Sequence, residues 1–482
     1  MATAAEPSEV LVPEREGVYG KQVVAVEPGG IEHIPDTERH GGPGQMFWTW
    51  MSPNLEFATI FVGVLGVAIF GGSFWTVAAG VILGTALGSI THAILSSWGP
   101  RLGVPQMVQG RAAFGFLGNI APSILMSIGS GIGWFAVNSV SATYALVTLL
   151  HLPFWLALVI VVLLQVAVAF FGHNLVHVWE RYAFIPLVVV FAVATLLVFT
   201  KANLGQGASP KGVGDVAAFI LTAAAAFGYA CGWNPYAADY TRYLPKTTSA
   251  VRTGIMAGLG IFVSCVVLEL MGAALATVAG TNFNGNPTAQ LAHSLPGAVA
   301  VVTLLAITLG GISANVLNIY SGAMAFLTIG IRLGARQRRA IVALVFGVIG
   351  FFVALVGGQT GLSTTYDDFL LVVGYWIAPW LGVVFSDYWL RRGNFGGAGI
   401  FYDHTHNPWS GIVAFVIGTA VSIYLFCNET IYVGPIPAHF PGIGDLTFVA
   451  GFVLSAAIYL ALNVDLRRRA TSPAAVPTSS GE

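Results

Sequence analysis

Long apolar segments alternate with short polar ones along almost the whole chain. Each is close to the ~20 residues that a helix needs to cross a ~30 Å hydrocarbon core. This pattern predicts an all-α polytopic membrane protein with twelve transmembrane helices. They form a single transmembrane domain (44–463), between a largely disordered N-terminal segment (1–43) and a C-terminal tail (464–482). The predicted spans are 44–72, 74–98, 119–148, 153–172, 181–200, 213–238, 253–280, 297–331, 340–357, 369–390, 409–427 and 443–463.

The basic residues set the direction of this threading. With the N-terminus inside, 18 of the 20 Lys and Arg residues fall on the inside, and only Lys201 and Lys211 fall outside. Cytoplasmic loops are enriched in basic residues. We therefore expect a multi-pass protein of the plasma (inner) membrane with both termini in the cytoplasm. The inside set is Arg15, Lys21, Arg39, Arg101, Arg111, Arg181, Arg242, Lys246, Arg252, Arg332, Arg336, Arg338, Arg339, Arg391, Arg392, Arg467, Arg468 and Arg469.

Composition excludes several classes of protein. The chain is 56% hydrophobic and 9% charged, whereas soluble domains are typically about 25% charged. The lipid bilayer is thus an expected partner. A net charge of −1 gives no basic surface for nucleic acid. Cys231, Cys265 and Cys427 all lie in apolar spans, so neither disulfides, a metal site nor another cofactor is expected. The oligomeric state is left open.

The loops are too short to fold into a catalytic domain outside the membrane, so function is expected at membrane depth. An enzyme would need a nucleophile with a base, or a metal set, at that depth, and no such set is visible. A helix bundle whose function lies at mid-depth is most often a transporter or a channel, while a non-transporting receptor or enzyme stays open as a less favoured alternative.

Two spans contain helix-breaking residues. Pro53 and Asn54 interrupt span 1, and Gly232, Asn234 and Pro235 interrupt span 6. Either pair alone could be an ordinary kink. The two breaks lie five helices apart, however, and a repeat of five helices inverts its topology. Discontinuous helices in corresponding places of inverted repeats indicate a transporter's binding site. We therefore expect a five-plus-five inverted repeat of the leucine-transporter-like kind, with discontinuous helices 1 and 6 and two extra helices.

Several segments resemble the purine-cytosine permease branch of the nucleobase-cation symporter family. The longest is GYACGWNPYAADYTRYLP at 228–245. The others are RLGVPQMVQGRAAFG (101–115), GIGWFAVNS (131–139), GGISANVLNIYS (310–321) and GYWIAPWLGVVFSDYWLRR (374–392). The resemblance spans about 31–469. It implies a secondary active transporter that imports a purine nucleobase, cytosine or both by cation symport with alternating access. A permease for allantoin, a hydantoin or a pyridine vitamer is the alternative.

The resemblance implies a set of substrate-binding residues. Trp134 matches the position whose indole stacks on the flat heterocycle, and such stacking is worth ~1–3 kcal/mol per base. Asn138 lies one turn further on the same helix face and can pair with the polar edge of the ring. Where relatives often carry a bulky aromatic, this chain has Ala230, so Tyr229 or Trp233 is expected to supply the second ring. In helix 8, the implied residues are Asn315 and, on a neighbouring position of the same face, Asn318. The plainer interpretation of these residues is packing for the aromatics and interhelical bonding for the amides.

A second set is implied for the coupling cation. The positions that bind sodium in some relatives correspond to Met51 and Asn54 in helix 1, and to Gly310, Ser313 and Ala314 in helix 8. Because Ala314 lacks the hydroxyl of sodium-using relatives, one oxygen ligand is missing. Two carboxyl groups, Glu56 and Glu269, lie within apolar spans, where an ionisable group is a functional candidate. An interhelical bond is the alternative role for both. Together with the proton coupling of fungal relatives, these features favour H⁺ over Na⁺.

Overall fold

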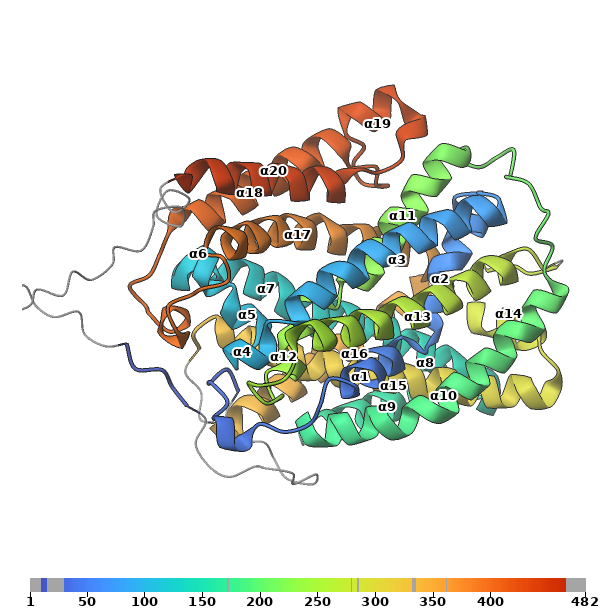
Figure 1. Cartoon of the computed structure of the whole chain (residues 1–482). Coiled ribbons are helices and arrows are strands. Elements are labelled where there is room, and N and C mark those ends of the chain that lie inside the picture. The colour runs from blue at the N-terminus through green and yellow to red at the C-terminus, as the bar shows by residue number, and fades with distance from the viewer. Residues whose placement is uncertain are drawn as a thin grey trace, which may run out of the picture.

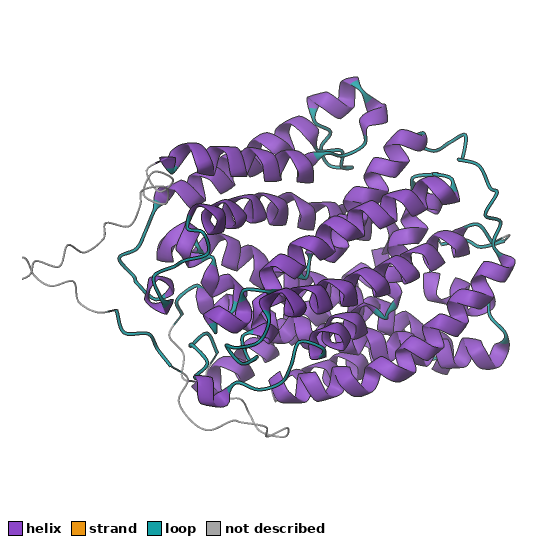
Figure 2. Cartoon of the chain, in the orientation of Figure 1, coloured by secondary structure: helices purple, strands orange, loops and turns teal. Residues whose placement is uncertain are grey.

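The computed structural model describes residues 10–14, 30–170, 173–278, 280–283, 286–331, 335–360 and 362–464. Within these ranges the regular secondary structure is helical (Figure 2), and two isolated bridges, Glu14 to His33 and Asn428 to Val433, are the extended pairings. This agrees with the composition, because a backbone in lipid must satisfy its polar groups within its own segment. The all-α prediction is confirmed.

Helices lie at all twelve predicted span positions. Within the part of the chain that the structure describes, eight helices are long and apolar enough to cross a membrane, one further span is a bent pair, and three shorter apolar helices occupy the remaining positions. The exact number of crossings stays a prediction. The main helices are α1 Gln45–Met51, α2 Phe57–Val64, α3 Phe74–Ser96, α7 Ile120–Ile128, α8 Phe135–Leu150, α9 Phe154–Phe170, α10 His173–Lys201, α11 Asp215–Cys231, α12 Ala237–Thr241, α13 Ala250–Ala276, α15 Gly297–Thr328, α16 Ala335–Thr360, α17 Leu362–Leu390, α18 Trp409–Phe426 and α20 Thr447–Leu462.

Shorter elements lie in the connections. They are α4 Gly99–Leu102, α5 Gln106–Gln109, α6 Arg111–Gly118, α14 Pro287–His293 and α19 Pro435–His439, with short 3-10 helices at Asp36–Glu38, Ala398–Phe401 and Pro441–Ile443.

The first span is broken in the middle, as its Pro and Asn predicted. Helix α1 continues as a 3-10 turn, η2, over Ser52–Asn54, and α2 begins only at Phe57. The two halves are bent by 63°. Leu55 and Glu56 lie between them in non-helical conformations and are buried. The backbone groups freed here therefore need partners from the protein itself.

The sixth span is interrupted more gently. Helix α11 ends at Cys231, a 3-10 turn (η5) covers Asn234–Tyr236, and α12 follows at Ala237. The segment 215–241 still reads as one apolar span. The Asn-Pro pair thus tightens the helix locally, while the sharp bend belongs to the first span.

The fifth helix begins eight residues before the predicted start. The prediction placed span 5 at 181–200, whereas α10 begins at His173 and has 29 residues. The stretch 173–180 is rich in polar residues and resembles a loop, but Asn174 and Glu180 within it are buried. A helix of 29 residues is about 43 Å long, so its first turns extend past the apolar core. Glu180 therefore belongs to the interior of the bundle.

Close packing between the helices depends on glycines at a few points. A Cβ at Gly63 would lie 1.7 Å from the Glu269 carbonyl oxygen, and one at Gly272 would lie 1.7 Å from the Ile60 carbonyl oxygen. These two glycines allow α2 and α13 to touch along their backbones. Figure 1 shows α17, α18 and α20 together at one side of the bundle, so the two extra helices lie beside the tenth predicted span.

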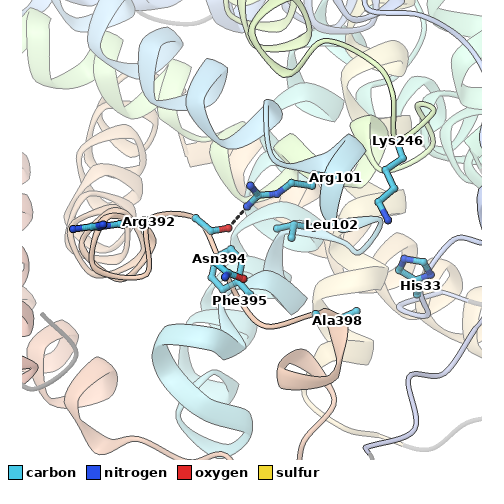
Figure 3. Close-up of a pocket in the computed structure, with 10 residues that line it drawn as sticks. His33, Arg101, Leu102, Lys246, Arg392, Asn394, Phe395 and Ala398 are labelled. Atoms are coloured by element: carbon cyan, nitrogen blue, oxygen red, sulfur yellow. Dashed lines mark hydrogen bonds between the residues drawn. The ribbon is translucent and has the colours of Figure 1, made fainter. Parts of the chain in front are cut away.

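Basic residues from three separate connections gather at one end of the bundle. Arg101, Lys246 and Arg392, with His33, line an open pocket of about 350 Å³ (Figure 3). The Arg101 guanidinium donates to the Gly393 carbonyl. Burial, and then the nearby Arg39 guanidinium, lower the pKa of His33, which favours its neutral form. These three connections lie at the same end of the bundle, as the predicted order of membrane crossings requires. That this end faces the cytoplasm stays a prediction.

Gly272→Ala tests the backbone contact between α2 and α13. The added methyl group would overlap the Ile60 carbonyl, and overpacking typically costs ~1–3 kcal/mol. We expect a lower melting temperature of the detergent-solubilised protein. Gly297→Ala is the matched control, because a Cβ there meets nothing within 4 Å. Equal melting temperatures for the two variants would contradict the packing.

Candidate substrate and cation sites

Trp134 lies at the end of a π-helical stretch in the third span. This stretch, η4, covers Gly129–Trp134 and leads directly into α8. Such π-bulges occur frequently at functional sites. The Trp134 ring is buried and meets Tyr229 edge-on at 5.3 Å and Phe369 edge-on at 5.0 Å between centroids. Gly232 lies against the indole, since a Cβ there would be 3.1 Å from Trp134 Cζ2. The predicted stacking residue is therefore surrounded by rings of α11 and α17.

A chain of hydrogen-bonded amides joins the third, sixth and eighth spans. The Tyr236 hydroxyl donates to Asn318 Oδ1 at 2.7 Å, and Asn318 Nδ2 donates to Asn315 Oδ1 at 3.0 Å. Asn138 Nδ2 also donates to Asn315 Oδ1, at 3.2 Å. Asn315 is thus in direct contact with both of the other predicted asparagines.

The three asparagines differ in what they have left to offer a ligand. Asn315 Nδ2 donates to the Phe135 carbonyl at 2.9 Å and to Ser139 Oγ at 3.1 Å, so both polar atoms of its side chain are used within the protein. Asn138 Oδ1, in contrast, is buried and has no hydrogen-bond partner among the described residues. Leaving a buried acceptor unpaired costs about 1–3 kcal/mol. Asn138 is therefore the amide that can accept a hydrogen bond from a bound molecule.

The break in the first span is held by aromatic residues of the sixth. Trp233 Nε1 donates to Asn54 Oδ1 at 2.8 Å, and Asn54 Nδ2 donates back to the Trp50 carbonyl at 2.6 Å. Thr59 Oγ1 donates to the Asn54 carbonyl at 2.6 Å and lies 2.5 Å from the Tyr229 hydroxyl. Tyr229 and Trp233 thus bind the break itself, and Tyr229 also presents its ring to Trp134.

Ala230 lies on a different face of α11. A Cβ added at Gly88 of α3 would be 2.6 Å from Ala230 Cβ, so this alanine packs directly against the second span. There is no room in this arrangement for a large aromatic side chain at this position.

Glu56 caps α2, the second half of the broken helix. Its Oε2 accepts from the Ala58 N–H at 2.8 Å, and its Oε1 accepts from the Thr59 N–H at 3.3 Å and the Tyr229 hydroxyl at 3.0 Å. A carboxylate is favourable at a helix N-terminus, where unpaired N–H groups point outward. These contacts give Glu56 a structural role at the break, which is the interhelical alternative left open by the sequence.

The predicted cation positions do come together at the break. A Cβ at Gly310 would lie 2.1 Å from the Leu55 carbonyl oxygen, so α15 touches the backbone of the break there. Ser313 Oγ lies 3.4 Å from Ser52 Oγ of η2. Ala314 is buried and contributes no oxygen from its side chain, and Met51 is the last residue of α1.

Glu269, the second acidic candidate, lies in a different place. Its Oε2 accepts from Thr85 Oγ1 of α3 at 2.7 Å, whereas its Oε1 has no partner among the described residues. It is fully buried, at the junction of α3, α13 and α2. The structure therefore separates Glu269 from Ser313 and assigns the two positions to different helix contacts.

Sequence reasoning missed a third buried acid that does lie beside the cation positions. Ser313 Oγ donates to Glu180 Oε2 at 2.6 Å, and Glu180 is fully buried on α10. The apolar pattern does not indicate it, because Glu180 lies just before the predicted span 181–200 in a polar stretch. A helical pattern carried back through 173–180 could have found it. Tyr236, Ser52 and Phe369 were also missed, since only the fold brings them to the site.

The comparisons with known proteins can now be set beside this geometry. Residues 33–451 match a family described as permease for cytosine/purines, uracil, thiamine and allantoin. The chain belongs to this family. Its members are permeases, so the chain is a transporter and not an enzyme.

Two relatives of the permease match over nearly its full length. A putative purine-cytosine permease, YxlA, of Bacillus subtilis is 30% identical over 447 residues, covering 91% of this chain and 96% of the relative. The purine-cytosine permease fcyB of Emericella nidulans is 28% identical, covering 96% of this chain and 95% of the relative.

The permease also shares its fold with a solved structure. This is Mhp1, a nucleobase-cation-symport-1 family transporter, in a closed conformation with bromovinylhydantoin bound. The TM-score is 0.73 at 18% identity, with 92% of this chain and 96% of Mhp1 covered. The predicted leucine-transporter-like fold class is confirmed by this agreement.

Asn315→Ala and Asn138→Ala distinguish a structural role in the amide chain from direct hydrogen bonding to the ligand. Removing Asn315 leaves the Asn138 and Asn318 amides without their acceptor, at about 1–3 kcal/mol for each unpaired group. We expect Asn315→Ala to lower the melting temperature of the ligand-free permease clearly more than Asn138→Ala does. The result that would refute this is an Asn315→Ala protein as stable as wild type.

Proposed function

We propose that this permease imports a purine nucleobase, cytosine or both across the plasma membrane by proton symport with alternating access. Both termini would lie in the cytoplasm. Residues 33–451 match the family of cytosine and purine permeases, and two relatives of nearly equal length are described as purine-cytosine permeases.

The observation that carries the substrate class is the pairing of Trp134 with Asn138. The two residues lie one turn apart on the third span, so they share a helix face. An indole face stacks on any flat ring, and an unpaired amide oxygen accepts one N–H. Purines and cytosine offer both features, a flat ring and N–H groups at its edge.

Asn315 and Asn318 would then fix the orientation of Asn138. Asn315 Oδ1 accepts from both neighbouring amides, which turns Asn138 Oδ1 away from Asn315 and leaves it for the ligand. Substituting either residue would thus weaken binding indirectly. Tyr229 would supply an edge-on ring beside Trp134, and Trp233 would hold the break through Asn54.

The coupling ion is proposed to be H⁺. Sodium needs several oxygen ligands, and Ala314 supplies none from its side chain. The fold instead places three fully buried carboxyl groups, Glu56, Glu180 and Glu269, within the bundle, where ionisable residues commonly form proton pathways. Met51, Asn54 and Gly310 remain candidates for carbonyl ligands if sodium is the ion.

A second candidate is a permease for another planar heterocycle. The family description includes uracil, thiamine and allantoin, and a bromovinylhydantoin is bound in the structure with the same fold. The Trp134 face would accept these rings too. What separates the candidates is the pattern of N–H and C=O groups that meets Asn138.

Trp134→Ala and Trp134→Phe test the stacking role. Losing the ring removes ~1–3 kcal/mol of stacking, so we expect a loss of apparent affinity of about 5- to 150-fold for Ala and partial retention for Phe. The measurement is uptake of labelled hypoxanthine, with unlabelled adenine, cytosine and allantoin as competitors. Wild-type uptake by Trp134→Ala would show that the substrate lies elsewhere.

The coupling ion is tested with the purified wild-type permease in proteoliposomes. We expect labelled hypoxanthine to accumulate when the outside is acidic relative to the inside. A protonophore should abolish accumulation, and replacing sodium with choline should leave it unchanged. Accumulation driven by a sodium gradient at constant pH would contradict proton coupling.

A further inference from the structure

Four segments that are far apart in the sequence form the pocket at the basic end of the bundle. They are α4, the connection after α12, the connection after α17, and the segment before α1. The volume of this basic pocket, about 350 Å³, lies within the ~300–1,000 Å³ usual for small-molecule sites. Among its lining residues, three are Arg or Lys and none is Asp or Glu. The pocket therefore has the size and the charge of a site for an anion.

The positive charges of the basic pocket are not balanced by the protein. Arg101, Lys246 and Arg392 form no ion pair within the part of the chain that the structure describes. The Lys246 ammonium lies near enough to His33 to lower its pKa, in addition to burial and the Arg39 guanidinium, which have larger effects. Like charges that share a pocket repel one another. A bound anion would remove this repulsion.

Figure 3 shows how the basic side chains are placed. The Lys246 ammonium points toward Leu102 and His33, and the Arg101 guanidinium donates to the Gly393 carbonyl. A guanidinium has five N–H donors, so Arg101 keeps donors beyond the one given to this carbonyl. Arg392 points away from the other labelled residues. Arg101 and Lys246 are therefore the groups placed to bind an anion, with Arg392 at the rim.

Hydrogen bonds between the segments hold the walls of the basic pocket. The Ile34 N–H donates to the Gly103 carbonyl at 3.0 Å, next to α4. The Tyr402 hydroxyl donates to the Ile31 carbonyl at 2.7 Å. These two bonds fix the segment that carries His33 against α4 and against the connection after α17. The cavity is thus formed by the fold in the absence of a ligand.

One side of the basic pocket is apolar, which narrows the class of ligand. Leu102, Phe395 and Ala398 line it and pack against the same hydrophobic cluster. A phosphate ester carries its charge at one end and carbon atoms at the other, which matches this division. Arg binds phosphate through its fork of N–H groups, and Lys binds it as a point charge.

We propose that the basic pocket binds the phosphate group of an anionic ester, with Arg101 and Lys246 holding the phosphate and the apolar side contacting the attached carbon group. The phosphate belongs to a lipid headgroup or to a soluble ester. Basic pockets between transmembrane helices on the cytoplasmic side bind lipid headgroups, and that is the side predicted for this end. None of the residues assigned to the heterocycle or the coupling cation lines the pocket, so this inference does not depend on the proposed function.

The bound phosphate connects parts of the permease that belong to different spans. Arg101 lies between the second and third spans, and Lys246 follows α12, the second half of the interrupted sixth span. The ligand neutralises both charges and holds these two connections together. It therefore stabilises the folded permease.

The test compares melting temperatures of the delipidated wild-type permease in detergent at constant ionic strength. The probes are phosphatidylglycerol and glycerol 3-phosphate, and their controls are phosphatidylcholine, which has no net charge, and sodium chloride. A ligand that binds the folded state raises the melting temperature. We expect at least one of the two phosphate esters to raise it above the value with its control.

Lys246→Gln shows whether this rise comes from the basic pocket. Lys246 is exposed and has no partner among the described residues, so its replacement removes no contact within the protein. We expect the dissociation constant of the active ester to increase about tenfold, the low end for a charge-assisted hydrogen bond, and further when Arg101→Gln is added. The double variant Lys211→Gln with Arg252→Gln is the matched control. It removes one Lys and one Arg at exposed positions outside the pocket and should behave like wild type.

The two probes also identify the source of the phosphate. A rise with phosphatidylglycerol alone supports a lipid headgroup, a rise with glycerol 3-phosphate alone supports a soluble ester, and a rise with both shows that the phosphate itself is recognised. The proposal is wrong if neither probe raises the melting temperature of the wild type, or if the rise in Lys246→Gln is as large as in the wild type.

Discussion

The structure depends on how the backbone groups of an interrupted helix find hydrogen-bond partners inside a membrane. At Leu55 and Glu56 the first span leaves backbone groups unpaired where no water is available, and each such group costs free energy if it stays so. Side chains next to the break bond these freed backbone groups. Glu56 accepts from N–H groups at the start of α2, and Thr59 donates to the Asn54 carbonyl. Residues around the break are therefore constrained first by backbone bonding and only then by the ligand.

The same constraint explains why structural and functional roles are shared by single residues. Tyr229 bonds Glu56 with its hydroxyl and meets Trp134 with its ring. Trp233 bonds Asn54 and lies one turn from Tyr229 on the sixth span. A ligand that displaces one of these rings also disturbs the break. Under the proposed function, substrate binding at these rings would act directly on the first span.

Much of this could be predicted from sequence because the signals are local. Apolar length locates the spans, and Pro53 with Asn54 marks the break. The resemblance identifies Trp134 and the asparagines. What could not be predicted are pairings between distant segments, such as Asn138 with Asn315 or Ser313 with Glu180, which depend on helix rotation. Glu180 could not be predicted because the polar residues of 173–180 are typical of a loop. Only the packing of α1 and α15 against α10 shows that Glu180 is buried in a helix. The packing of Ala230 against Gly88 could not be predicted from the sequence either.

The central claim is that a flat, N–H-bearing ring binds between Trp134 and Asn138, beside the break. A cryo-EM structure of the permease with hypoxanthine tests it most directly. The account predicts density for the ring parallel to the Trp134 indole, with a ring N–H within hydrogen-bond distance of Asn138 Oδ1. Hypoxanthine bound elsewhere, for example in the basic pocket lined by Arg101 and Lys246, with no density at Trp134, would contradict it.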